Sequence, residues 1–472
     1  MIITAAEAAE SCGARLFGDA SAVITKIATD SRDDFSNGGM FVAIEGERVD
    51  GHKFISQTVE AGASAVLLSR SSFIPEEVPA GCAYILTDDV GRALLDIGRY
   101  CRSRLDIPIV AVTGSVGKTT TREMVAEAIS AEKRTFRTKK NFNSQIGLPV
   151  TMQSIEDEEI AVLEAGISIP GEMARLASVI RPDVVVMTNI GVAHIEFLGS
   201  REGIFEEKFE LARALGPEGV LIVNGDDDIL GRLEPAAYPF RVIKCGMGPE
   251  NDVRAEHVVH GRVGSCFTAV LSDRKIPVDL GVIGDHMILN ALLALAAADV
   301  CGVDAEAAAA KLSAYSGYEG RQRIEEIGGV AWICDYYNAS PDSMKAALKV
   351  LSDMDCDGKR VAVLGNMYEL GPDSPRFHRE VGHAAAGSGA DVLLTVGENA
   401  KEIAAGAAEA AGGSGSKDGR AELRIESFDD IDACFGAMKQ ILRPGDAVLL
   451  KASNSMRFGR LRDLWEENAS RK

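Results

Sequence analysis

Short apolar runs alternate with longer segments of helical spacing through most of the chain. In its middle, the runs at 107–112, 160–163, 184–188 and 220–223 have the length of buried strands. The segments between them place apolar side chains three or four residues apart, as one face of a helix does. Because strands that alternate with helices form mostly parallel sheets, this region predicts an α/β fold.

The same alternation continues on both sides of this region. Glycine-rich turns between short apolar runs predict a small α/β domain in residues 1–100. Residues 101–317 form the predicted central domain, in which the alternating stretch 252–283 is typical of antiparallel strands. A Rossmann-like domain is predicted in residues 318–472, with a surface loop at 411–419. The outer strands are expected at 40–44 and 65–68 in the first domain and at 330–334, 360–364, 392–396 and 447–450 in the third.

Length and composition agree with this picture and narrow the possible partners. A chain of 472 residues exceeds what one core usually organises. It has 50 Lys and Arg residues against 70 Asp and Glu residues, a net charge of −20, so we expect no nucleic acid partner and no stable membrane insertion. Nine cysteines without a CxxC pair predict neither a zinc site nor disulfides. No signal-like leader is apparent, and we expect a cytoplasmic monomer.

The clearest chemistry lies at 110–120, Val-Ala-Val-Thr-Gly-Ser-Val-Gly-Lys-Thr-Thr, where a buried run meets a glycine turn and a helix start. The glycines let backbone N–H groups approach phosphate oxygens, Lys118 adds a positive charge, and Thr119 offers a hydroxyl to Mg2+. The strict Walker pattern has a glycine where this chain has Val112, so the loop is a shortened one. A glycine turn without a ligand is the alternative, but the helix that follows favours a nucleotide triphosphate. The residues expected to contact ATP here are Gly114, Ser115, Val116, Gly117, Lys118, Thr119 and Thr120.

Two polar residues follow predicted strands, at the sheet edge where ligands of α/β proteins bind. Glu164 ends the run at 160–163 and can present a carboxylate to a metal ion near Thr119. His194 comes just after the run at 184–188. A solvated carboxylate is the alternative for Glu164, and a hydrogen-bonded loop residue is the alternative for His194.

An ordered set of motifs across nearly the whole chain resembles the Mur ligase family. A single motif can arise by chance, whereas the order of the set is specific. Motifs at 335–344, 363–371 and 450–453 point to the member that adds a dipeptide, and the Asp-Asn-Pro-Arg run of diaminopimelate-adding relatives is absent. The matching segments are 29–32, 50–52, 113–120, 138–147, 164–166, 189–194, 284–290 and 320–321.

The resemblance implies an ATP-dependent, Mg2+-requiring ligase of peptidoglycan synthesis. It would join D-alanyl-D-alanine to UDP-N-acetylmuramoyl-tripeptide through an acyl phosphate, releasing ADP and phosphate. The first domain would bind the UDP end, the central domain ATP, and the third the incoming amine. Alternatives are a non-catalytic nucleotide-binding scaffold of the same shape, and a folylpolyglutamate-type or other family ligase with a different amine. The motifs around Asp30 and His52 argue against the folate reading.

Residue roles follow from the same resemblance. Thr119 and Glu164 would hold one Mg2+ and His194 a second. Lys208 matches the lysine that the family carbamylates, although a lysine among helical glutamates would ordinarily be a solvated, salt-bridged side chain. The resemblance assigns catalysis to Lys118, His194, Lys208 and Asp335. It assigns further ATP contacts to Asn290, Arg321 and Asp335, with His286 bordering the adenine. The UDP-substrate contacts would be Asp30, Ser31, Arg32, His52, Asn141 and Asn143, and the amine-substrate contacts would be Tyr337, Asn338, Lys451 and Ser453.

The chain also departs from the family pattern. Cys334 stands where the family usually has the first of two aspartates, so one carboxylate is missing. We expect these departures, taken together, to touch the face that binds the dipeptide and the joined substrates. They are Ser144, Cys334, Ser340, Asn366 and Ala452.

Overall fold

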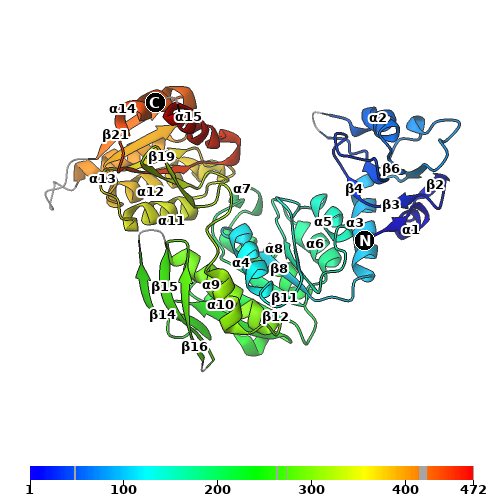
Figure 1. The fold of residues 1–472 in the computed structure, drawn as a ribbon, viewed down its shortest axis with the longest axis horizontal. Helices are drawn as coiled ribbons and strands as arrows, with labels where there is room; N and C mark the ends of the chain where they lie inside the picture. The colour runs from blue at the N-terminus through cyan, green and yellow to red at the C-terminus, as the bar shows by residue number, and fades with distance from the viewer. Residues whose placement is uncertain (47–48, 262–263, 273, 414–422, 471–472) are drawn as a thin grey trace.

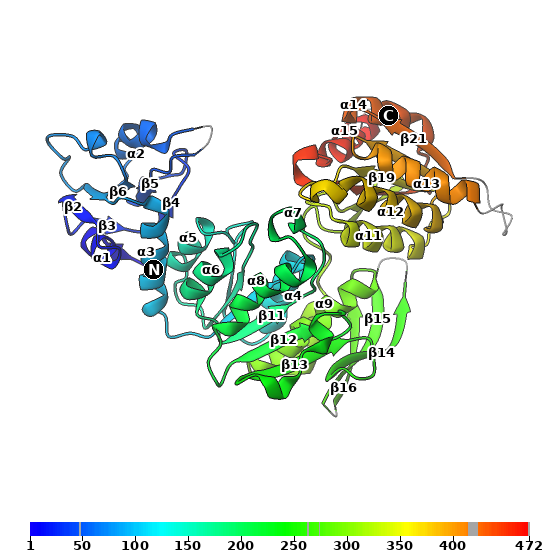
Figure 2. The same cartoon turned by 180° about the vertical axis from the view of Figure 1, so that it is seen from behind.

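The computed structural model describes residues 1–472 except 47–48, 262–263, 273, 414–422 and 471–472. Three separate α/β units follow one another along the chain, and the predicted three-domain α/β fold is confirmed. In Figures 1 and 2 the first and last units lie at opposite ends of the molecule, with the central sheet between them. Within the described residues, no helix combines the length and the apolar character needed to cross a bilayer.

The first unit is built on a small five-stranded sheet. Its strands lie in the order β2-β7-β6-β5-β4, and only β2 runs antiparallel to its neighbour. A two-stranded ribbon of β1 and β3 accompanies it. The elements are β1 (Ile3–Thr4), α1 (Ala5–Ser11), β2 (Arg15–Gly18), β3 (Val23–Ile24), β4 (Ile27–Ala28), β5 (Met40–Val42), α2 (Ile55–Glu60), β6 (Ala65–Leu68), β7 (Ala83–Leu86) and α3 (Val90–Ser103).

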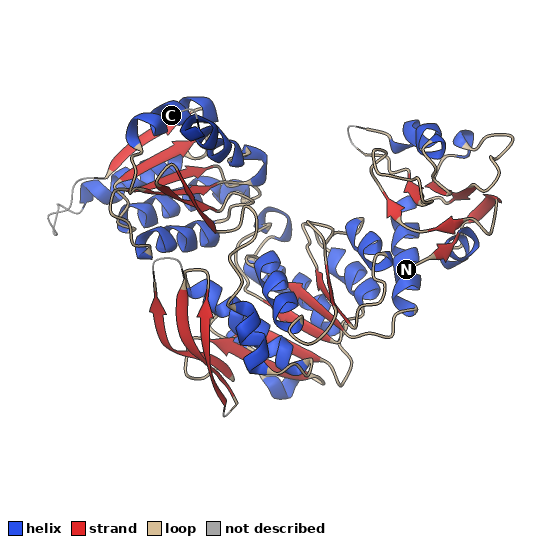
Figure 3. Cartoon of the chain, viewed as in Figure 1, coloured by secondary structure: helices blue, strands red, loops and turns tan. Residues whose placement is uncertain are grey.

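A nine-stranded sheet of order β16-β15-β14-β13-β12-β11-β8-β10-β9 forms the central unit. It is parallel from β9 to β14, and the alternating stretch forms the antiparallel strands predicted for it. Helices α4, α9 and α10 cover one face, and α5, α6 and α8 cover the other (Figure 3). The elements are β8 (Ile109–Thr113), α4 (Lys118–Ile129), β9 (Thr135–Arg137), α5 (Gly147–Gln153), β10 (Ile160–Glu164), α6 (Glu172–Ile180), β11 (Val184–Met187), α7 (Ile195–Leu198), α8 (Arg201–Arg213), β12 (Val220–Asn224), β13 (Arg241–Gly246), β14 (Val253–His260), β15 (Ser265–Leu271), β16 (Arg274–Leu280), α9 (Asp285–Val300) and α10 (Ala305–Leu312).

The third unit is a six-stranded sheet of order β17-β18-β22-β19-β20-β21, parallel except for β17. Helices α11, α12 and α13 pack on one face, and α14 and α15 pack on the other. The segment expected to be a surface loop falls largely on residues 414–422, outside the described residues, and 411–413 end helix α13. The elements are β17 (Arg323–Ile327), β18 (Val330–Cys334), α11 (Pro341–Asp353), β19 (Arg360–Gly365), α12 (Ser374–Gly387), β20 (Val392–Val396), α13 (Lys401–Gly413), β21 (Arg424–Phe428), α14 (Ile431–Ile441), β22 (Ala447–Lys451) and α15 (Gly459–Ser470).

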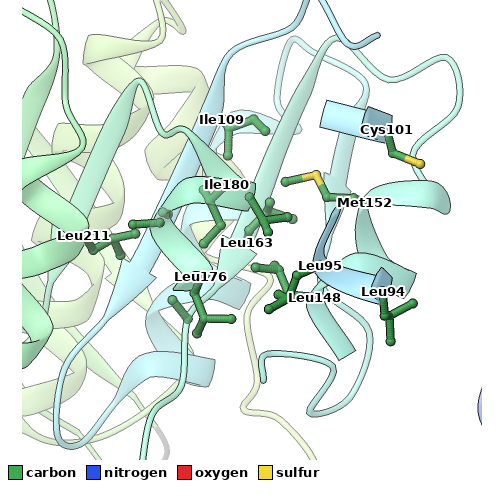
Figure 4. Close-up of a cluster of buried hydrophobic side chains, with 14 of the residues drawn as sticks. Leu94, Leu95, Cys101, Ile109, Leu148, Met152, Leu163, Leu176, Ile180 and Leu211 are labelled. Atoms are coloured by element: carbon green, nitrogen blue, oxygen red, sulfur yellow. The ribbon is translucent and has the colours of Figure 1, made fainter. Parts of the chain in front are cut away.

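Helix α3 joins the first two units without a break. It runs across residue 100, where the sequence suggested a domain boundary. Figure 4 shows Leu94 and Leu95 of α3 beside Leu148 and Met152 of α5. The same continuous apolar cluster reaches back to the first sheet through Leu67.

Candidate active site

The phosphate loop connects strand β8 to helix α4. Gly117 caps the helix at φ 85°, and Gly114 has φ 146°, both conformations that favour glycine. A Cβ atom at Gly114 would lie 1.9 Å from the Thr188 hydroxyl oxygen, so close packing also requires glycine there. Lys118 Nζ donates to the carbonyls of Gly114 at 2.9 Å and Ser115 at 3.2 Å. The loop therefore presents a cation and a helix N-terminus to one spot, which suits an anion.

The loop after β11 supports the phosphate loop. The sequence did not reveal this supporting role. The Asn189 side-chain amide accepts a hydrogen bond from the backbone N–H of Val116 at 2.9 Å and donates one to the backbone carbonyl of Val116 at 3.0 Å. Thr188 Oγ1 donates to the same carbonyl. Because Met187 pairs with Thr113 across the neighbouring strands, both loops leave the sheet at one edge.

Glu164 lies at this edge with both carboxylate oxygens engaged. Thr119 Oγ1 donates to Oε2 at 2.9 Å, Asn143 Nδ2 donates to Oε1 at 2.7 Å, and the buried Arg122 lies 3.3 Å from Oε2. The solvated alternative for Glu164 is wrong, because the residue is 2% exposed. Asn143, which was predicted to contact the UDP substrate, thus contacts Glu164 in the central unit, whereas the predicted UDP contact Asp30 lies in the first unit. Arg122 was missed by the sequence reasoning.

These oxygens suit Mg2+. In the described part of the chain, no group of three or more His, Cys, Asp and Glu side chains is arranged to hold a metal ion. Mg2+ is usually bound by one or two carboxylates together with substrate phosphates and water, so a carboxylate and a hydroxyl beside a phosphate loop fit it. The residues in place are Thr119 and Glu164.

Lys208 is fully buried on helix α8, so the alternative of a solvated, salt-bridged lysine is wrong. Its Nζ has no hydrogen-bond partner among the described residues. Burial, and next the positive charge of Lys118, lower the pKa of Lys208 well below its usual value. A signal was present in the sequence, since Lys208 stands four residues after Ile204 and three before Leu211, on the buried face of the helix.

His194 stands on the loop before α7 in the left-handed conformation, at φ 65°. Its Nδ1 lies 2.6 Å from Oε2 of Glu369, a contact between ion-pair groups rather than a well-directed hydrogen bond. The contact lowers the pKa of Glu369, against the opposing effect of its partial burial. Glu369 belongs to the third unit, and sequence reasoning gave it no role.

The third unit contributes an ion pair between the buried Lys451 and the partly exposed Asp335 to the same cleft. Lys451 Nζ lies 2.6 Å from Asp335 Oδ2 and donates to the Asn338 carbonyl at 3.1 Å. The Arg321 guanidinium lies over the Tyr337 ring, 4.0 Å from its centroid. This places predicted ATP-binding and amine-binding residues side by side.

The adenine-side candidates come from the start of α9. Asn290 Oδ1 accepts from Thr121 Oγ1 at 3.1 Å, which ties α9 to α4. His286 Nε2 lies 2.5 Å from Gln322 Oε1, and burial lowers the pKa of His286. Gln322 was not anticipated from the sequence.

One cleft of about 630 Å3 between the central and third units gathers most of the predicted residues. Lys208 and Gly114 do not line it, although Lys208 is close enough for Lys118 to affect its pKa and Gly114 belongs to the phosphate loop. The predicted residues that line it are Ser115, Val116, Gly117, Lys118, Thr119, Thr120, Asn141, Asn143, Glu164, His194, His286, Asn290, Arg321, Asp335, Tyr337, Asn338, Lys451 and Ser453.

The predicted UDP-binding residues of the first unit lie elsewhere, around the five-stranded sheet. Asp30 and Arg32 form an exposed ion pair at 2.6 Å, which lowers the pKa of Asp30 to about 2, and Ser31 stands between them. His52 is buried, with Nδ1 2.8 Å from Asp50 Oδ1. Arg70 binds the other oxygen of Asp50 at 2.9 Å. Of the predicted UDP contacts, only Asn141 and Asn143 share the large cleft.

The departures from the family pattern do not all touch the cleft, which corrects the expectation. Cys334 and Ala452 are buried in the apolar layer under α14 and α15, so a carboxylate at 334 would not face a substrate. Asn366 is also buried, and it accepts from the backbone N–H of Ala400 at 2.9 Å. Ser144 and Ser340 line the cleft, and Ser340 also caps α11.

A loop that offers a lysine and a helix N-terminus to a cleft shared by two α/β units is the arrangement of a P-loop nucleotide-binding enzyme. Three family models match consecutive parts of the chain: Mur ligase family, catalytic domain, at 23–99; Mur ligase middle domain at 112–298; and Mur ligase, glutamate ligase domain, at 321–454. The chain belongs to the Mur ligase family.

Individual relatives agree over nearly full length. UDP-N-acetylmuramoyl-tripeptide--D-alanyl-D-alanine ligase of Bacillus subtilis (strain 168) is 37% identical over 95% of this chain and 94% of its own. The protein of the same name from Synechocystis is 35% identical over 92% and 90%. Crystal structure I of MurF from Acinetobacter baumannii superposes with a TM-score of 0.87 at 28% identity, covering 99% of both chains. MurF ligase from Thermotoga maritima in complex with ADP gives 0.81 at 28% identity, over 94% and 98%.

Proposed function

We propose that this protein is an ATP-dependent ligase that joins D-alanyl-D-alanine to UDP-N-acetylmuramoyl-tripeptide in peptidoglycan synthesis. The observation that carries the proposal is the single cleft in which the phosphate loop and Glu164 face Asp335 and Lys451 of the third unit. The names of the relatives at 35–37% identity support the choice of substrates. The nine free cysteines fit the cytoplasm, which we propose as its location.

In the first step the free carboxylate of the tripeptide attacks the γ-phosphorus of ATP, and the bond to the β,γ-bridging oxygen breaks. The products are an acyl phosphate and ADP. Two anions must approach each other, so cations in the cleft are required. Lys118 on the phosphate loop and Arg321 from the third unit supply them. Mg2+ bound by Thr119 and Glu164, with a second ion at His194, would add further neutralisation of the phosphate charge.

Lys208 has the properties that carbamylation needs. A neutral amine adds to CO2 and loses one proton, which converts the side chain from a base to an anion. Burial and the positive charge of Lys118 lower the pKa of Lys208, which favours the neutral amine, and its Nζ is free of partners among the described residues. The carbamate would place an anion on the metal side of the cleft.

In the second step the amine of D-alanyl-D-alanine attacks the acyl carbon, an amide forms, and phosphate leaves. We assign the dipeptide to the wall of the cleft formed by Tyr337, Asn338, Lys451 and Ser453. Closure of the central and third units over the cleft would keep water from the acyl phosphate, which hydrolysis would otherwise consume.

The remaining assignments concern the two ends of the molecule. The UDP end of the substrate would lie on the first domain, residues 1–100, near Asp30, Ser31, Arg32 and His52. Residues 101–317 would form the ATP-binding domain, and residues 318–472 the domain that binds the incoming amine. The exposed Arg32 guanidinium offers donors suited to a nucleotide diphosphate, whereas both ring nitrogens of the buried His52 are engaged by Asp50 and Ser69.

A phosphate-release assay tests the proposal. Purified protein is given ATP, Mg2+, UDP-N-acetylmuramoyl-tripeptide and D-alanyl-D-alanine, and each is omitted in turn. We expect phosphate release only in the complete mixture, together with a product heavier by one dipeptide in mass spectrometry. Release without a wall substrate, or none in the complete mixture, contradicts the ligase function. Lys118→Ala is the matched inactive variant.

A further inference from the structure

The segment that carries His194 belongs to the central unit but packs on the third. Val192 and Ile195 contact the apolar cluster under α11 and α12. Gly191 lies close to Asp342 of α11, since a Cβ atom there would be 2.4 Å from Oδ2. Next to it, α7 contacts the short 3-10 helix Gly371–Asp373. The position of this histidine is therefore set partly by the third unit.

Glu369, which faces His194, lies on a loop whose backbone is held by hydrogen bonds to two side chains. The N–H of Met367 donates to Nε2 of the buried His378 at 3.0 Å. The N–H of Tyr368 donates to Ser453 Oγ at 3.2 Å. Glu369 itself has φ 62°, a left-handed conformation that side chains seldom adopt. These contacts fix the backbone from which the Glu369 side chain reaches His194.

The contact between the two residues selects one imidazole nitrogen. Nδ1 of His194 lies 2.6 Å from Glu369 Oε2, which leaves Nε2 as the nitrogen for a ligand in the cleft. Histidines that bind metal ions commonly face a carboxylate with their other ring nitrogen, which orients the ring. In this structure the contact has ion-pair distance without directed hydrogen-bond geometry, so charge and proximity orient the ring. Here the carboxylate comes from a different unit than the histidine.

We propose that Glu369 is a positioning residue that orients His194 toward the second divalent metal ion. The inference rests on the ligase function proposed above and adds a requirement to it. The second metal position is complete only when the loop of the third unit reaches His194, so metal binding and the packing of the two units are coupled.

A simple ion pair between units is the competing explanation, and it makes different predictions. The Glu369 side chain is 47% exposed, and ion pairs at that exposure contribute little to stability. If Glu369 acts only as such a pair, its loss leaves divalent metal binding unchanged. If it orients His194, its loss weakens one metal position by about 10–100-fold while the protein stays as stable as before.

Mn2+ binding separates the two explanations without relying on turnover. The full-length protein with ADP and bicarbonate is titrated with Mn2+, and free Mn2+ is followed by electron paramagnetic resonance. We compare wild type, Glu369→Gln, Glu369→Asp and the control Glu398→Gln. Glu398 is an exposed glutamate of the same unit, paired with Lys401. We expect two classes of Mn2+ in wild type, with the weaker class at least about tenfold weaker in Glu369→Gln, intermediate in Glu369→Asp and unchanged in the control.

A double variant tests whether Glu369 acts through His194. His194→Ala should lose the weaker class, and adding Glu369→Gln should cause no further loss. In the ligase assay Glu369→Gln should raise the KM for Mg2+ with little change in the KM for the dipeptide. Wild-type Mn2+ binding by Glu369→Gln, a single class in wild type, or an additional loss in the double variant would overturn the inference. If wild type has no turnover, the ligase proposal fails, and the Mn2+ comparison still decides the role of Glu369.

Discussion

Replacing the buried Lys208 with methionine should make the protein more stable and at the same time inactive. The Nζ atom has no partner among the described residues, and a buried polar group without a hydrogen bond costs about 1–3 kcal/mol. Methionine has a similar length and no polar group, so the substitution removes this cost without leaving a large cavity. At about 2–4 °C per kcal/mol for a domain of this size, the unfolding midpoint should rise by several degrees.

The midpoint is measured by calorimetry without Mg2+ or bicarbonate, so that the lysine is compared as an amine. Lys311→Met, on the exposed side of α10, is the matched control and should leave the midpoint where it is. A fall in the midpoint of Lys208→Met would refute the reasoning about the unpartnered amine.

Turnover should change in the opposite direction. The carbamate that would help to hold the second Mg2+ cannot form, and losing the charge neutralisation that this ion would supply should reduce turnover by about 100-fold or more. In Lys208→Ala the side-chain volume is freed, so excess chloride or a short carboxylic acid should restore part of the phosphate release. Undiminished turnover in Lys208→Met would show that no carbamate is needed.

Three further substitutions test other parts of the site. Gly114→Ala should weaken ADP binding by at least about tenfold in isothermal titration, because the new Cβ meets the Thr188 hydroxyl and the backbone has φ 146°; wild-type affinity would contradict this. Asp335→Asn leaves the buried Lys451 cation without its carboxylate and should destabilise the third unit by about 3 kcal/mol in denaturant unfolding, so an unchanged midpoint would show that this ion pair does not stabilise the unit. Burial lowers the pKa of His378 from 6.5, so the unfolded chain binds its proton first and stability is lost as the pH falls below about 6.5. His378→Gln should flatten the decline in thermal midpoint between about pH 7.5 and 5.5, and an equally steep decline would exclude that histidine as its source.

The sequence predicted the strands well, because fully buried parallel strands are continuous apolar runs. The expected strand at 184–188 corresponds to Val184–Met187, and that at 392–396 to Val392–Val396. It also predicted the edge at which the phosphate loop, Glu164 and His194 meet, because ligands of parallel sheets bind at the carboxyl ends of strands.

Contacts between distant segments could not be predicted in the same way. Arg122 and Glu369 gain their partners only when loops from different strands are brought together. The orientation of Cys334 depends on which face of β18 it occupies, and a run that is apolar on both faces does not reveal that. Lys208 was read by its charge, although its position on the helix indicated the core.

Helix α3 has a consequence for how the molecule responds to heat and force. Its buried side belongs to one unbroken apolar cluster that extends from the first sheet to α6 and α8, whereas the third unit has apolar clusters of its own, which the centre joins through Ile283, Val192 and Ile195. Because one cluster spans the first two sheets, we expect their separation to expose more apolar surface than separation of the third sheet from them. We therefore expect the first 317 residues to unfold as one cooperative body and the last 155 as another, so that calorimetry resolves two transitions for three sheets.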